Sequence, residues 1–251
     1  MTILQTSIPF DPLTPRPLPG ILPASMDDWL HCDDAFAGQM QRREVLLRER
    51  RLDVLALDSA AEPAAQELLE LVLHHVYPGR TDQVTRPDGQ VVEIDRTRPL
   101  DTLCRLVQED FCILQKYADQ HVLTAAILCF PASWRLSEKF MRPLIDIHIP
   151  VSGYDANIAR RVQRLFDGIQ PGRPLWRFNA LWYEDAELYQ PRSANDRREV
   201  GDPGAARFLR SERQTLLRLP ETRAVVFSIH TYVLEAQRLH KWKTPPDGGA
   251  S

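Results

Sequence analysis

The period of the hydrophobic pattern changes near residue 110, and this change limits the possible folds more than any other feature of the chain. Before it, Leu68, Val72 and Val76 recur every four residues, the spacing of one face of an α-helix. After it, the run VLTAAILCF (122–130) is continuously apolar, and its length and β-branched residues favour a strand. A helical first part followed by strands predicts an α+β fold.

The same patterns assign most of the remaining segments. We expect helices over 34–51, 59–76, 100–108 and 154–166, and strands over 111–114, 122–130, 174–183 and 224–234. The first of these helices carries many charges (QRREVLLRERR), which predicts a solvated amphipathic helix. Pro87-Asp88-Gly89 predicts the turn of a small hairpin, and the polar segment 193–204 predicts an exposed loop.

Prolines are concentrated near the beginning of the chain, where six lie between residues 9 and 23. Because proline lacks an amide donor and has a fixed φ, this segment is expected to be neither a helix nor a central strand. We therefore predict an extended arm over residues 1–24, a single domain over 25–240 and a disordered tail over 241–251.

Charge and composition argue against several classes of protein. The 251 residues carry a formal net charge of −3, so no positive field attracts nucleic acid. No stretch approaches the roughly 20 apolar residues of a membrane span, and the first residues lack the pattern of a secretory signal. The four cysteines form no C-x-x-C pair, which argues against a zinc or dithiol site. We expect a cytoplasmic protein whose cysteines are small apolar core residues.

Common catalytic motifs are absent from the sequence, and most histidines have an ordinary structural explanation. There is no phosphate-binding G-x-x-x-x-G-K-[ST], no G-x-G-x-x-G, no G-x-S-x-G and no H-E-x-x-H. His74 and His75 are adjacent on a predicted helix, so their side chains diverge and do not easily share a metal. The segment HCDD (31–34) is either a metal cluster or a loop whose acidic residues cap the next helix, and capping is better supported.

His148 lies in an apolar segment, PLIDIHIP, that has a proline at each end. If this segment is extended, alternation places Ile145, Ile147, Ile149 and Val151 on one side and His148 on the other. A haem iron requires a neutral imidazole on a rigid backbone among apolar side chains. The two prolines of this segment stiffen its backbone, and its isoleucines supply the apolar surroundings. On the residues alone, a buried and hydrogen-bonded histidine remains the better-supported alternative.

Three long segments resemble one known family, that of the α subunit of haem-dependent oxidative N-demethylase. They are VQEDFCILQK (107–116), CFPASWRLSEKFMRPLIDIHIPVSGY (129–154) and LRSERQTLLRLPETRAVVFSIHTY (209–232). Weaker similarity is found in MDDWLHCDDAF (26–36) and LWYEDAELYQP (181–191). The resemblance spans roughly residues 20–235.

The resemblance implies a haem-binding PAS-like fold, with an antiparallel sheet that has helices on one face. The sheet core is expected over about 110–240 and an N-terminal helical extension over about 25–109. The resemblance also implies oxidation of a small secondary amine, such as dimethylamine, by O₂ at haem b. Electrons from NADPH are implied to arrive through partner subunits that carry flavin and an iron–sulfur cluster. The alternative function is a haem protein that senses or binds a gas without catalysis.

The resemblance also yields candidate site residues. His148 is the expected iron ligand, Lys139, Arg142 and Arg177 are expected partners of the haem propionates, and Asn179 and Arg213 are expected near the reacting molecules. A surface ion pair with Glu212 or Glu221 is an alternative for Arg213. The chain departs from the family pattern at Ala180, where tryptophan is more usual, and at His230, where arginine or lysine is more usual.

Overall fold

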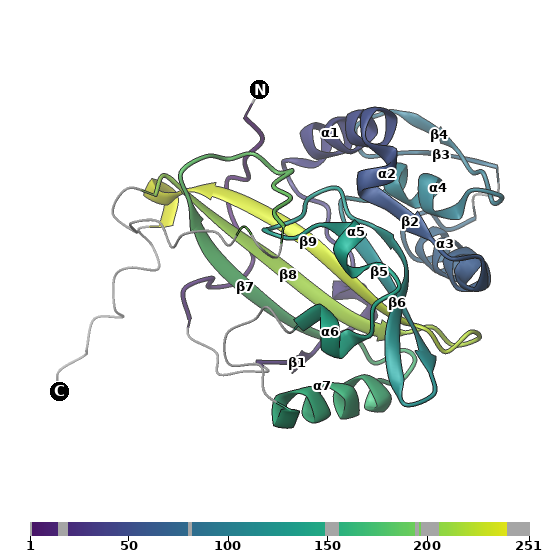
Figure 1. Ribbon diagram of the computed structural model, residues 1–251. Helices are drawn as coiled ribbons and strands as arrows, with labels where there is room; N and C mark the ends of the chain where they lie inside the picture. Colours follow the sequence, from purple (N-terminus) through teal and green to yellow (C-terminus); the bar gives the residue numbers. More distant parts are fainter. Residues whose placement is uncertain are drawn as a thin grey trace, which may run out of the picture.

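The sheet at the centre of the protein has seven strands in the order β1-β7-β8-β9-β5-β6-β2, and each neighbouring pair is antiparallel (Figure 1). This computed structural model describes residues 2–14, 20–79, 82–148, 156–193, 196 and 206–239. The strands are β1 (Leu22–Pro23), β2 (Leu55–Leu57), β5 (Asp110–Tyr117), β6 (Gln120–Ile127), β7 (Leu175–Tyr183), β8 (Phe208–Arg218) and β9 (Val225–Glu235). The predicted α+β class is confirmed, whereas the PAS-like assignment stays a prediction.

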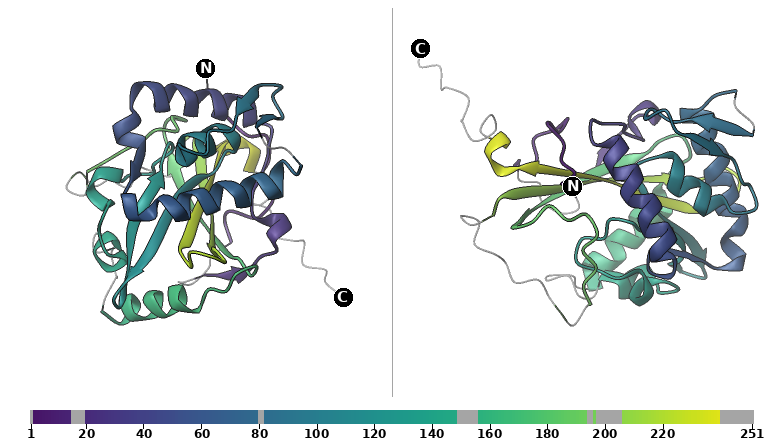
Figure 2. Two further views of the ribbon diagram at one scale, coloured as in Figure 1. Left: turned by 90° about the vertical axis from the view of Figure 1, so that its right-hand side faces the viewer. Right: turned by 90° about the horizontal axis from the view of Figure 1, so that it is seen from above.

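Helices cover both faces of this sheet. One layer contains α1 (Phe36–Glu49), α2 (Arg51–Val54), α3 (Glu62–Val76) and α4 (Pro99–Leu106), together with the hairpin of β3 (Gln83–Thr85) and β4 (Val91–Glu93). The other layer contains α5 (Leu136–Lys139), α6 (Leu144–His148) and α7 (Ala156–Gly168). Single 3-10 turns are η1 (Met26–Asp28), η2 (Ser59–Ala61) and η3 (Ala236–Leu239). Figure 2 shows α7 on the side of the sheet away from α1 and α3; we call the two sides the α7 face and the α3 face.

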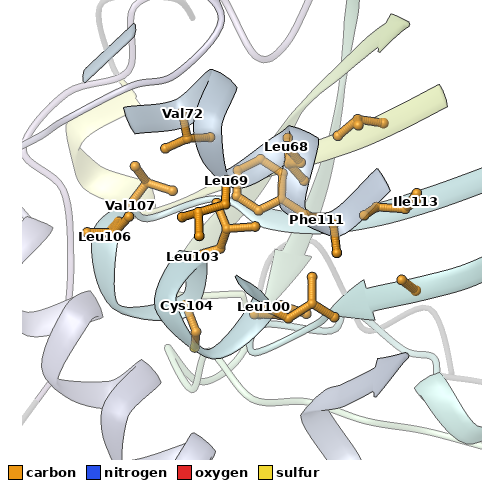
Figure 3. Close-up of a cluster of buried hydrophobic side chains, with 14 of the residues drawn as sticks. Leu68, Leu69, Val72, Leu100, Leu103, Cys104, Leu106, Val107, Phe111 and Ile113 are labelled. Atoms are coloured by element: carbon orange, nitrogen blue, oxygen red, sulfur yellow. The ribbon is translucent and has the colours of Figure 1, made fainter. Parts of the chain in front are cut away.

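Alternation along the strands divides most of the buried apolar residues between two large clusters, one on each face, and a smaller third cluster contains Ile8, Leu209, Tyr232, Leu234 and Leu239. On β5, Phe111 and Ile113 pack with α3 and α4 on the α3 face, as Figure 3 shows. Cys112 and Leu114 point the other way and pack near Phe166 of α7. Because successive side chains of a strand point to opposite faces, one central sheet supports both cores.

The structure agrees with most of the predicted elements. The helices α1, α3, α4 and α7 overlap the predicted ranges 34–51, 59–76, 100–108 and 154–166. The four predicted strands are present, and the hairpin lies where the turn residues indicate. Three strands of the sheet were not predicted, β1, β2 and β8. The charges of LRSERQ conceal β8, because Arg210, Glu212 and Arg213 are charged and yet nearly fully buried.

The predicted extended conformation of the His148 segment is wrong over 144–148, where the chain forms α6. One helical turn brings Leu144 and Ile147 to the same side, and both pack in the α7-face cluster. Pro143 precedes the helix, where its fixed φ suits a helix start. Ile149 and Val151 lie outside the described residues.

Two further expectations meet the structure only in part. The helix predicted as solvated buries one of its charges completely, since Arg43 has no exposed surface. Within the proline-rich arm, Leu22 and Pro23 pair with β7 as an edge strand. Residues 15–19, most of the loop 193–204 and the tail 241–251 lie outside the described residues. Within the described part of the chain, no helix has the length and apolar character to cross a membrane.

Candidate functional site

Five polar side chains, which we call the Glu212 cluster, lie together on the α7 face. The pairing of β7 with β8 sets Arg177 beside Gln214 and Asn179 beside Glu212, and Lys139 comes from the end of α5. The amides of Asn179 and Gln214 donate to Glu212 Oε2 over 3.0 and 3.1 Å. The backbone N–H of Glu212 donates in turn to Asn179 Oδ1 over 3.1 Å. This carboxylate is therefore held in one orientation.

Positive charge exceeds negative charge in the Glu212 cluster. Burial lowers the pKa of Lys139 and of Arg177, and the Glu212 carboxylate opposes both shifts. The Lys139 ammonium lies 4.4 Å from the centre of the Trp134 ring. Arg177 Nε is buried and has no hydrogen-bond partner among the described residues. The cluster is therefore suited to binding an additional anion, such as a carboxylate.

Two other predicted site residues lie in α6 or just before it, and α6 covers this face of the sheet. His148 is the last residue of α6, whose Ile147 packs in the α7-face cluster, but the His148 side chain lies outside the described residues. Arg142 is exposed, and its carbonyl accepts a hydrogen bond from Leu123 N over 3.1 Å. The unpartnered Arg177 Nε and the half-buried Lys139 ammonium are therefore the groups on this face best suited to bind carboxylates.

Arg213 lies on the opposite face of the sheet. It is the cross-strand neighbour of His230 on β9, and its side chain is buried there. Its guanidinium donates to Asp28 Oδ2 over 2.7 Å, to Thr215 Oγ1 over 2.8 Å and to the carbonyls of Asp28 and Trp29. Its carboxylate partner is therefore Asp28, rather than Glu212 or Glu221, and Arg213 does not join Asn179.

A second polar site on the α3 face was not predicted. His230 is buried, with Nδ1 2.9 Å from Glu109 Oε1 and Nε2 3.0 Å from Asp33 Oδ2. Burial opposes a charge on this ring, but the two carboxylates outweigh burial and raise the pKa of His230 to about 9. Burial likewise opposes the charge of Asp33, but hydrogen bonding with His230 outweighs it and lowers the pKa of Asp33 to about 2. His230 is therefore an imidazolium between two carboxylates.

His31 and Tyr232 connect this buried ion pair to a cavity of about 390 Å³. Tyr232 Oη lies 2.6 Å from His31 Nδ1, and His31 Nε2 lies 3.0 Å from Asp28 Oδ1. Burial lowers the pKa of His31, which favours the neutral ring. No group of three or more metal-binding side chains is found among the described residues. Asp33 Oδ1 accepts a hydrogen bond from Ala35 N in the turn before α1, but α1 has no side-chain cap, so the predicted capping of this helix by the acidic residues is wrong. The sequence offered one signal for this site, the similarity of segments 26–36, 107–116 and 209–232 to one family.

A comparison with protein families matches residues 20–247 to the family described as "Haem-dependent oxidative N-demethylase, alpha subunit-like". The match extends from β1 to beyond β9, so it includes both polar sites. The family predicted from the sequence is confirmed.

Proposed function

This chain belongs to the haem-dependent oxidative N-demethylase, alpha subunit-like family, and on that premise we propose that it oxidises an N-methyl group of a small secondary amine, such as dimethylamine. Haem b bound on the α7 face would supply the activation of O₂ and the oxidation, which releases formaldehyde and the shorter amine. The observation that supports this location is the buried, unpartnered Nε of Arg177 on the same face as α6.

In this proposal, each residue has a role that follows from its position. His148, at the end of α6, would hold the haem iron, as the resemblance implies. Arg177 and Lys139 bind the two propionates, since a guanidinium offers a rigid fork and an ammonium offers a compact charge. Arg142 is exposed, so we assign it at most to the rim.

Glu212 is the carboxylate whose charge acts on both of these cations, and Asn179 is hydrogen-bonded to it. Both ends of the Asn179 amide bond to Glu212, so Asn179 orients the carboxylate rather than contacting the amine. Glu212 is then available to hold the proton of a secondary ammonium. The surrounding cluster, which includes Leu216, Phe166 and Ile229, excludes water.

The two departures from the family pattern fall away from this site. Alternation along β7 turns Ala180 to the face opposite Asn179, and His230 lies on the α3 face with Arg213. Neither change therefore alters a group proposed to contact haem or amine. The chain has no flavin or iron–sulfur motif, so electrons must come from a partner reductase.

The ligand assignment is tested by the substitution His148→Ala, with His74→Ala as the matched control because His74 is exposed on α3. After reconstitution with haem, we expect the Soret band of the His148→Ala protein to shift or disappear and that of the control to match the parent. An unchanged band in both proteins would eliminate His148.

The activity is tested separately with haem protein, a reductase that carries flavin and an iron–sulfur cluster, NADPH and dimethylamine. We expect formaldehyde in excess of a control that lacks the haem protein. If haem binds but formaldehyde does not exceed the control, the demethylase proposal fails and gas binding becomes the better explanation.

A further inference from the structure

Two cysteines that are 25 residues apart in sequence meet inside the α3-face core. Cys104 lies on α4, where Figure 3 shows it in the cluster with Leu100 and Leu103. Cys129 follows the end of β6. Their sulfur atoms are 3.6 Å apart, and neither side chain has exposed surface. A short movement would bring the two atoms to the separation of a disulfide, about 2.05 Å.

The surroundings of this pair are unusual for apolar core residues, because a buried guanidinium lies beside it. Arg43 Nε donates to the carbonyl of Cys104 over 3.1 Å, and Nη1 donates to Asp110 Oδ1 over 2.6 Å. The same Asp110 oxygen accepts from the Cys129 N–H over 2.8 Å. Arg43 Nη2, although fully buried, has no hydrogen-bond partner among the described residues. A negatively charged sulfur would supply the missing partner.

The protein contains an internal comparison for this environment. The hydrogen bond from Cys129 and the charge of Arg43 lower the pKa of Cys104 despite its burial. Cys112 is also buried but lies on the α7 face, and burial raises the pKa of that thiol to about 12. The thiolate is the reactive form of cysteine, so Cys104 and Cys112 differ in the property that controls oxidation.

We propose that Cys104 and Cys129 are a redox modification site at which hydrogen peroxide forms a reversible disulfide. The Cys104 thiolate attacks one peroxide oxygen, so that an S–O bond forms, the O–O bond breaks and hydroxide leaves and takes a proton to become water. Cys129 then attacks the Cys104 sulfur, so that the S–S bond forms, the S–O bond breaks and a second water leaves. Two electrons pass from the thiols to the peroxide, and a dithiol reductant reverses the change.

A chain of hydrogen bonds and one ion pair connects this site to the α7 face. The Asp110 carboxylate accepts hydrogen bonds from the backbone N–H groups of Cys129 and Phe130. The Phe130 carbonyl accepts from Arg210, whose guanidinium lies 3.6 Å from Glu212 Oε1. Closing the disulfide would shift Cys129 and therefore Arg210 and Glu212. This consequence rests on the proposed function, whereas formation of the disulfide does not.

The proposal is tested on the full chain carrying Cys32→Ser, which removes the exposed thiol. The folded protein is treated with hydrogen peroxide, remaining thiols are alkylated after denaturation, and peptides are mapped without reduction. We expect a cross-linked Cys104–Cys129 peptide, an intact mass lower by two hydrogens, and recovery of both thiols after reduction. Cys112→Ser should leave the cross-link unchanged, and Cys104→Ser or Cys129→Ser should abolish it.

A kinetic comparison excludes reaction through unfolding. In untreated native protein, alkylation of Cys112 reports the opening of the fold, and we expect cross-linking to be at least about tenfold faster than that alkylation. Absence of the cross-link, or cross-linking only as fast as Cys112 becomes accessible, would overturn the proposal. These readouts need neither amine nor reductase, so a failed demethylase assay leaves them intact.

Discussion

His230 shows how one residue can differ from its family pattern and retain its physical role. The resemblance expects arginine or lysine at this position, and both are cations. The imidazole of His230 is also a cation here, because Glu109 and Asp33 keep its pKa near 9 despite burial. The buried ion pair is therefore preserved. Its cation, the His230 imidazolium, loses its proton at a lower pH than arginine or lysine does.

This substitution makes stability depend on pH in a defined window. An unfolded histidine titrates near 6.5, whereas folded His230 titrates at about 9. The stabilisation by His230 is therefore complete below pH 6.5, declines as the pH rises and is lost above about 9. We predict that His230→Gln removes this decline between pH 6.5 and 9. At pH 6 it should also cost about 3–5 kcal/mol, because two buried carboxylates lose their partner.

Urea unfolding at several pH values measures both effects. His74→Gln is the matched control, since it changes an exposed histidine of α3 and should retain the parent's dependence on pH. A His230→Gln protein with the parent's slope between pH 6.5 and 9 would show that His230 is uncharged in the folded state.

At the scale of single elements, β8 marks the limit of what the sequence could predict. The apolar strands and the helices follow from spacing and composition, because their buried residues are hydrophobic. β8 buries Arg210, Glu212 and Arg213, whose cost of burial is offset largely by hydrogen-bond and ion-pair partners that are distant in the sequence. The sequence pattern of a single segment does not reveal which distant residues it contacts. Neither β8 nor the His230 site could therefore be derived from such a pattern.

The segment around α6 illustrates the opposite case. The alternation of LIDIH suits a strand, yet one helical turn also buries apolar residues of this segment, so a five-residue pattern does not distinguish a strand from a helix.

Lys139, Arg177 and Asn179 were named from sequence and lie on one face, whereas Arg213 was named with them and lies on the other. The strand register separates them, and the register depends on a strand that the sequence did not reveal.

Adjacent residues of β8 provide a test of the two faces. Leu216 packs in the α7-face cluster and Leu217 in the α3-face cluster, and both are buried. We predict that Leu216→Ala and Leu217→Ala each lower the free energy of unfolding by about 2–5 kcal/mol. Only Leu216→Ala should also weaken haem binding, because only this substitution leaves a cavity on the α7 face, where haem is proposed to bind.

Urea unfolding and a haem titration followed at the Soret band separate these effects. Each leucine serves as the control for its neighbour. Equal losses of haem affinity in the two variants would argue against haem on the α7 face.

For the whole molecule, two cores on one sheet predict an uneven response to cofactor removal. The α3-face core contains α3 and α4 and needs no cofactor to bury its side chains. On the other side lie α6 and α7, and the proposed haem binds on that face of the sheet. We therefore predict that removing haem speeds amide hydrogen exchange in α6, α7 and β7 and leaves α3 and α4 nearly unchanged.

Mass spectrometry of the haem-loaded and haem-free proteins, digested after matched exchange times, makes this comparison. Equal changes in α3 and α7 would indicate that the two cores open together. Slower exchange confined to the residues around His31 and Tyr232 would instead place the ligand in the cavity of the α3 face.

The lengths of the outer strands have a consequence for how a reductase could dock. At one border of the sheet β1 has two residues, one of them Pro23, and at the other β2 has three. Strands this brief present few free amide and carbonyl groups, but β1 pairs only with Leu175 and Trp176, and the rest of the nine-residue β7 pairs with β8 alone. Strand addition by another chain, whether an electron-donating subunit or a second copy, is therefore disfavoured at β1 and β2 and less disfavoured along the part of β7 beyond Trp176.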